Sequence, residues 1–206
     1  MHQTRPPRFW LVGFSFLSIV RILDPTIDTD LIVLVDETDK PVGTAPKLET
    51  HRKGLLHRAV SALVKDPRGN ILLQQRAGGK YHSEGLWTNA CCSHPRTHES
   101  VGEAVERRLF EEMGVLCELK PLFTTHYRAT VSNGLIENEI VHVFGGTYDV
   151  RKDGTVAPAP EEASDWKWMA FDELLADQAA RPEHYSIWFR HYLRNHGDAI
   201  ADWMRG

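Results

Sequence analysis

The chain has 206 residues, of which 42% are hydrophobic and 25% charged, and its formal net charge is −4. This composition excludes bulk disorder, and the small negative charge gives no general attraction to nucleic acid, so anion binding must come from locally placed Arg and Lys. Three cysteines are too few for a disulfide framework, and we expect reduced thiols in a cytoplasmic, reducing compartment.

We expect residues 1–29 to form an N-terminal extension and residues 30–206 to form a single domain. Arg5 and Arg8 precede an apolar run over 9–20, which is too short to span a bilayer but resembles the core of a signal peptide. No small-x-small cleavage site follows this run. A secretory signal, a docking helix, a weak membrane-surface segment and a misassigned start codon all stay open, and no integral membrane span is expected.

Strands and turns dominate the first part of the domain. An apolar, β-branched run predicts a strand over 31–35, and residues 42–44 can pair back onto it. Strand-forming residues over 57–65, turn residues over 66–70 and a second apolar run over 71–76 predict a β-hairpin.

The rest of the chain adds helices to this sheet. Apolar residues at helical spacing predict a helix over 100–113, which ends at a glycine. Two strands, over about 116–130 and 135–148, flank a turn. A short strand at 166–169 and two helices from Phe171 onward complete the chain. These elements predict an α+β fold, with a mixed β-sheet sandwiched between helices.

The segment 87–95 places a thiol two residues from an imidazole, just before the predicted helix. If the segment is a strand, Cys92 and His94 project from one face and can enter one pocket. Cys91 and Ser93 then point away, and we assign Cys91 to packing. The alternative, which this pair alone leaves open, is a small buried cysteine beside a capping histidine.

The acids and arginines of the predicted helix allow two interpretations. They can form pairs between residues three or four apart on a solvated face. They also match most of the Nudix signature, a loop-helix-loop motif that holds divalent metal against a diphosphate, when Ser93 is taken as its first position. The matching residues are Glu99, Arg107, Leu109, Glu111, Glu112, Gly114 and Val115.

Two positions depart from the signature. Ser93 replaces its first glycine, and Arg108 replaces a glutamate of the catalytic helix. A guanidinium in place of a carboxylate weakens a metal cluster and adds a fork for phosphate. We therefore expect this helix to hold a diphosphate rather than cut it.

Further matches, spread in order along the domain, make the chain resemble the type I isopentenyl-diphosphate isomerases, which have the Nudix fold. The matching residues are Lys47, His51, His57, Arg76, Lys80, 87–89, 92–95, 127–129, 137–139 and Trp188. The resemblance implies an isomerase of isoprenoid biosynthesis that converts isopentenyl diphosphate to dimethylallyl diphosphate. Such a reaction adds one proton, removes another and requires no redox cofactor.

The resemblance also assigns two metal sites. One holds Mn²⁺, Zn²⁺ or Mg²⁺ through three imidazoles and two carboxylates, a donor set that suits these ions. Its residues are His51, His57, His94, Glu137 and Glu139. The second site holds Mg²⁺ between Glu112 and the substrate diphosphate. The other histidines, His82 among them, are expected to be ordinary surface or core residues.

The resemblance assigns the diphosphate to four cations, whose charges would offset that of the substrate. They are Lys47, Arg76, Lys80 and Arg108. An alkene is a very weak base, so its protonation needs a positioned acid and exclusion of water. Cys92 and Glu139 are expected to be the acid-base pair. Tyr127 is expected beside Glu139, and Trp188 is expected to face the developing cation.

Two other functions stay open on the sequence alone. A Nudix hydrolase would use the helix glutamates and have no need of Cys92. A non-catalytic domain would bind a diphosphate or RNA without turnover, although the composition argues against RNA. We expect a small-molecule diphosphate as the partner, no nucleic acid, and a monomer or weak dimer.

Overall fold

Residues 31–206, the part of the chain that the computed structural model describes, are organised around a mixed sheet of nine strands. The strands are β1 (Leu31–Val35), β2 (Pro41–Pro46), β3 (His57–Lys65), β4 (Asn70–Arg76), β5 (Trp87–Asn89), β6 (Cys91–Ser93), β7 (Leu119–Thr130), β8 (Ile136–Thr147) and β9 (Ala163–Ala170). The helices are α2 (Lys47–Lys53), α3 (Val101–Met113), α4 (Val150–Asp153), α5 (Phe171–Ala180), α6 (Ile187–Asn195) and α7 (Gly197–Arg205). The predicted extension, residues 1–29, lies outside the described residues.

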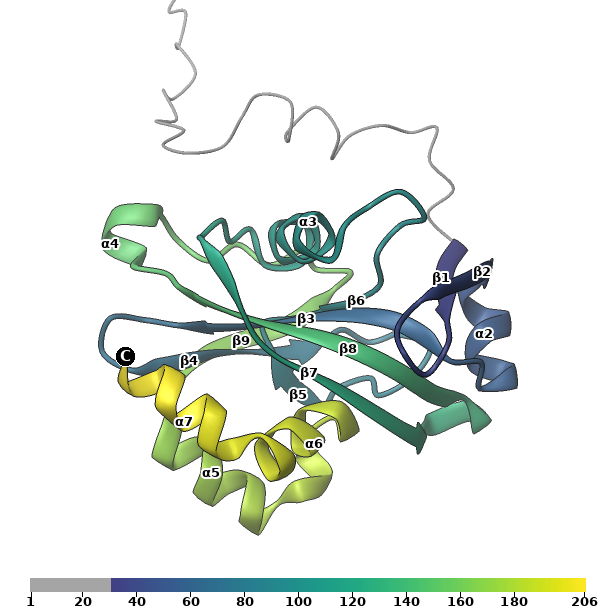
Figure 1. The fold of residues 1–206 in the computed structure, drawn as a ribbon. Coiled ribbons are helices and arrows are strands. Elements are labelled where there is room, and N and C mark those ends of the chain that lie inside the picture. The colour runs from purple at the N-terminus through teal and green to yellow at the C-terminus, as the bar shows by residue number, and fades with distance from the viewer. Residues whose placement is uncertain (1–30) are drawn as a thin grey trace, which may run out of the picture.

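Helices cover both faces of this sheet (Figure 1). Helix α3 packs on one face, and α5, α6 and α7 pack on the other. Alternate residues of β3 supply the two cores: Ala59 and Leu63 pack with α6, while Val60 and Val64 pack with α3. A strand buried on both faces is largely apolar, as the centre of β3 is from Ala59 to Val64, with Ser61 the one exception. The predicted α+β sandwich is confirmed.

The turn of the predicted hairpin over 57–76 is confirmed, but its two strands pair mainly with other strands and not with each other. Asp66 closes the turn by accepting the Asn70 backbone N–H at 2.8 Å. Beyond it, β3 and β4 pair only at Lys65 and Ile71. Strand β3 pairs in parallel with β8 and antiparallel with β6, whereas β4 pairs with β5 and β9. The strands therefore diverge, because each finds longer partners elsewhere in the sheet.

Other predicted elements are confirmed, with two exceptions. Strand β2 pairs back onto β1, and a capping box at Ser100 and Glu103 starts α3. Neither helix α2 nor the short helix α4 was predicted. The prediction of two C-terminal helices was wrong, because Pro182 and Gly197 divide that region into three. Within the described residues, none of the helices combines the length and apolar character needed to cross a membrane.

Candidate active site

Four predicted metal ligands meet at one end of the sheet, although they come from four separate segments. His51 lies on α2, His57 begins β3, His94 follows β6, and Glu139 lies on β8. Their ligand atoms all lie within 4.8 Å of one another. The parallel register of β3 and β8 places His57 directly beside Glu139. Strand pairing thus brings together residues that are far apart in the sequence.

The orientation of the rings in this four-residue group fits a cation. The Nδ1 atoms of His51 and His57 lie 2.7 and 2.8 Å from backbone carbonyl oxygens, so each Nδ1–H donates to the backbone and leaves Nε2 with a lone pair. Nε2 of His57 lies 3.2 Å from Nε2 of His94, and Glu139 Oε1 lies 3.2 and 3.1 Å from these two atoms. Lone pairs this close repel one another, and a divalent ion among them would relieve that repulsion.

Burial keeps the imidazoles in the form that binds metal. It lowers the pKa of His94 to about 3 and also lowers the pKa of His51. Both rings are therefore neutral near pH 7, and a neutral imidazole is the form that ligates a divalent ion.

Glu137, the fifth predicted ligand, lies beside this group but not in it. Its Oε2 lies 2.8 Å from the Tyr127 hydroxyl, and its Oε1 lies 3.3 Å from His82 Nε2. The same hydroxyl lies 2.9 Å from Glu139 Oε2. Burial, and then the nearby Glu139, raise the pKa of Glu137 to about 8. Burial alone would also raise the pKa of Glu139, but the hydrogen-bonded imidazoles hold it well below its usual value.

The two neighbouring cysteines face opposite sides of the sheet, as predicted. Cys92 packs with the core under α6, and its Sγ lies 3.9 Å from the Tyr192 hydroxyl. Burial raises the pKa of the Cys92 thiol well above its usual value, so the thiol is protonated at neutral pH. Cys91 was predicted only to pack, yet its thiol also donates to Glu112 Oε1 at 3.5 Å.

One small cavity, about 70 Å³ in volume, is lined by residues predicted for catalysis and for diphosphate binding. Those residues are Lys47, Arg76, Lys80, Arg108, Cys92, Glu112, Glu137, Glu139 and Trp188. The Arg76 guanidinium lies 5.1 Å from the centre of the Trp188 ring. Burial, together with the neighbouring cations, lowers the pKa of Lys47. The four cations provide donors for a polyanionic ligand, while the four glutamates that line the same cavity offset their charge.

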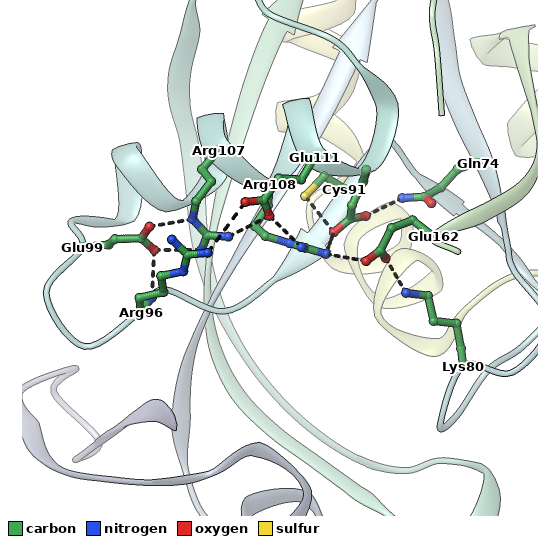
Figure 2. Close-up of polar contacts among 10 residues, drawn as sticks. Gln74, Lys80, Cys91, Arg96, Glu99, Arg107, Arg108, Glu111 and Glu162 are labelled. Carbon is green, nitrogen blue, oxygen red and sulfur yellow. Dashed lines mark hydrogen bonds and ion pairs between the residues drawn. The ribbon is translucent and has the colours of Figure 1, made fainter. Parts of the chain in front are cut away.

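Helix α3 contains both of the arrangements that its sequence allowed (Figure 2). Arg107 donates to Glu99 at 2.5 Å and to Glu111 at 2.9 Å, which makes those residues structural ion pairs. Glu112 is buried at the cavity, where Arg108 donates to its Oε1 at 2.8 Å. Gln74 donates to the other oxygen of Glu112 at 2.9 Å. The structure thus separates a structural half of the motif from a half that faces the cavity.

Three residues near the cavity were missed by reasoning from the sequence. His82, expected to be an ordinary histidine, is only 3% exposed and lines the cavity beside Glu137. Glu162 pairs with Lys80 and Arg108, and Gln74 orients Glu112. His82 and Glu162 lie in irregular segments, where no periodicity marks a residue. The sequence therefore carried no signal for either residue.

Comparison with known proteins identifies the family of this chain. Residues 55–189 match the family model of the NUDIX domain. Isopentenyl-diphosphate Delta-isomerase 2 of Aromatoleum aromaticum is 52% identical over 77% of this chain and 82% of that protein. Isopentenyl-diphosphate Delta-isomerase of Burkholderia multivorans is 47% identical over 81% of this chain and 92% of that protein. The solved MutT protein from Methanosarcina mazei Go1 shares the fold, with a TM-score of 0.54 at 22% identity over 68% of this chain and 91% of that one. The chain therefore belongs to the NUDIX domain family and, within it, to the isopentenyl-diphosphate Delta-isomerases.

Proposed function

We propose that this chain isomerises isopentenyl diphosphate to dimethylallyl diphosphate, and that residues 30–206 are the catalytic unit. The observation that carries the proposal is the single cavity in which Cys92 and Glu139 face the same space as four cations. A hydrolase that uses the helix carboxylates has no need of a thiol at this position. The names of the relatives support the same reaction.

Binding would begin with the diphosphate. Lys47, Arg76, Lys80 and Arg108 would offset its charge, Arg through paired N–H groups and Lys as point charges. Mg²⁺ held by Glu112 and the diphosphate would neutralise further charge at the same end of the substrate. The hydrocarbon end would then lie against Trp188 and Cys92, beneath α6, where water is excluded.

The chemical step would be a pair of proton transfers. One proton is added to the terminal methylene, and another is lost from the carbon next to the C–O carbon, so the double bond moves and the net composition is unchanged. Cys92 and Glu139 would serve as the donor and acceptor. Tyr127 would exchange a proton with Glu139 through their 2.9 Å contact. The Trp188 ring would stabilise the developing cation by about 0.5 to 2 kcal/mol.

The four-residue group would hold Mn²⁺, Zn²⁺ or Mg²⁺ through His51, His57, His94 and Glu139, with Glu137 close by. When bound, the ion supplies positive charge that increases the acidity of a proton on the Glu139 side of the cavity. We also propose a cytoplasmic location, since this chemistry needs a free thiol and Cys91, Cys92 and Cys117 are all free.

The test is to incubate the purified protein with isopentenyl diphosphate in D₂O, with and without a chelator, and to follow the allylic product by NMR. We expect deuterated dimethylallyl diphosphate, and we expect the chelator to abolish it. Phosphate release that is insensitive to thiol alkylation would instead identify a hydrolase. Binding without deuterium incorporation would identify a non-catalytic domain.

A further inference from the structure

Glu162 lies between two of the four cations of the cavity. Its carboxylate pairs with Lys80 through one oxygen and accepts from Arg108 Nη2 at 3.1 Å through the other. Figure 2 shows this carboxylate between the two basic side chains. Glu162 and Lys80 are 82 residues apart in the sequence, so their contact joins the segment before β9 to the loop after β4. This bridge between Lys80 and Glu162 therefore forms only when the tertiary structure brings the two segments together.

The four cations differ in whether an acid neutralises them. Within residues 31–206, neither Lys47 nor Arg76 forms an ion pair with a carboxylate, whereas Lys80 and Arg108 both pair with Glu162. Arg108 also pairs with Glu111 at 2.7 Å and with Glu112 at 2.8 Å, so Lys80 is the cation that depends most on Glu162. Although burial opposes it, Arg108 and Lys80 hold the pKa of Glu162 below its usual value, so this carboxylate stays ionised. A phosphate oxygen approaching Lys80 or Arg108 would therefore meet an acceptor that is already in place.

Glu162 also lies at the outer part of the cavity. The side chains of Lys80, Arg108 and Glu162 are each 20% exposed, while Glu139 is only 3% exposed. The cavity volume is about 70 Å³, well below the roughly 300 Å³ at which ligand pockets begin. The cavity is therefore too small to hold a diphosphate ester unless side chains of its lining move, and those at the outer part are the more exposed ones. The bridge from Lys80 to Glu162 is one of the contacts that must yield.

We propose that Glu162 stands in for the substrate diphosphate in the free enzyme, holding Lys80 and Arg108 until the diphosphate displaces it. This inference rests on the proposed function. It makes Glu162 an internal competitor that weakens diphosphate binding, and a ligand needs enough negative charge to replace it. The residue keeps two cations paired in the free protein and sets how tightly the pocket holds a diphosphate.

The test is to replace Glu162 by glutamine, which keeps its shape and one acceptor oxygen but removes its charge. Inorganic pyrophosphate is titrated by calorimetry into the full-length protein with Mg²⁺ in fixed excess, and KM for isopentenyl diphosphate is measured in parallel. Glu162→Gln should lower both the Kd and KM, on the order of three- to tenfold. The matched control is Glu161→Gln, at the exposed neighbouring position, and its Kd should stay within about twofold of wild type.

The direction of the change in Kd distinguishes competition between Glu162 and pyrophosphate from structural damage to the site. A variant that merely disturbs the site binds pyrophosphate more weakly, so an unchanged or raised Kd for Glu162→Gln overturns the inference. If Glu162→Gln does not fold, Glu162→Ala carries the same expectation and the same refutation. Failure of the wild-type protein to bind pyrophosphate would instead overturn the proposed diphosphate pocket, and the inference with it.

Discussion

Replacing Tyr127 by phenylalanine tests the polar network at the centre of the site. Tyr127 is 6% exposed, and its hydroxyl lies 2.8 Å from Glu137 and 2.9 Å from Glu139. A hydroxyl has only one proton to donate, so the second short contact requires a proton on a carboxyl group. Glu137, whose pKa is raised to about 8, carries that proton at neutral pH. The hydroxyl then donates to the ionised Glu139.

The cost of this substitution follows from the two contacts. A hydrogen bond to a charged group contributes about 1.5 to 3 kcal/mol, and one to a neutral group contributes about 1 kcal/mol. Phenylalanine fills the same ring volume, so no cavity is added. We expect Tyr127→Phe to destabilise the metal-free protein by about 3 kcal/mol, which corresponds to a fall in Tm of about 6 to 12 °C for a domain of this size.

The assay is urea denaturation of the chelated protein at pH 7, followed by circular dichroism. The matched control is Tyr148→Phe, because Tyr148 is also buried but donates only to the Asp153 carbonyl, at 3.0 Å. That control should lose about 1 kcal/mol. If Tyr127→Phe lies within about 0.5 kcal/mol of wild type, the two carboxyl groups do not depend on the hydroxyl and the reasoning is refuted.

Three further predictions concern the thiol, the metal and pH. Cys92→Ser should keep the fold and pyrophosphate affinity but lose isomerisation by several orders of magnitude, whereas Cys91→Ser should be nearly silent, since a serine hydroxyl can still donate to Glu112. Normal turnover by Cys92→Ser would contradict the catalytic assignment. Adding Mn²⁺ or Zn²⁺ at about 100 times its Kd should stabilise the chelated protein by about 2.7 kcal/mol, and His94→Ala should abolish the rise in Tm; an equal rise in both proteins would place the ion elsewhere. Burial lowers the pKa of His82 and His94 to about 3 from 6.5, and raises that of Glu137 from 4.5 to about 8. Between pH 6.5 and 4.5 the unfolded metal-free chain therefore binds two protons on these two imidazoles, against one that folded Glu137 retains, and His51, whose pKa is also lowered by burial, adds in the same direction. Stability should fall by about 1.4 kcal/mol or more per pH unit as the pH falls. Above about pH 7 the imidazoles of the unfolded chain are mostly neutral as well, and the raised pKa of Glu137 should then make stability fall as the pH rises to 8; urea midpoints that climb steadily from pH 5 to 8 would disagree.

The sequence predicted the fold class because its strands and long helix carry strong patterns. It predicted strand partners less well, since alternation identifies a strand such as β3 without saying that β8 and β6 lie beside it. Helix α2 escaped prediction because its seven residues are mostly polar and show no apolar period. It ends at Gly54, which adopts a left-handed φ of 61° against the side chain of Ile136.

The residues of the site also divide into those that the sequence could place and those that it could not. Residues two apart on a strand, such as Glu137 and Glu139, could be placed on one face from their spacing alone. The meeting of His51, His57 and His94 could not be derived in that way, and it came from the family resemblance. His82 and Glu162 act through loops that tertiary packing brings to the cavity, so neither spacing nor resemblance marked them.

Binding of an ion at the four-residue group depends on the register in which β3 pairs with β8. His57 and Glu139 are direct neighbours in this parallel pair, and both face the four-residue group. A slip of one residue in either strand would turn one of them to the opposite face of the sheet. The slipped chain could keep much of its apolar burial, because β3 is apolar on both sides, yet it would lose the ion. Metal affinity thus distinguishes the native alignment from a compact misfolded one.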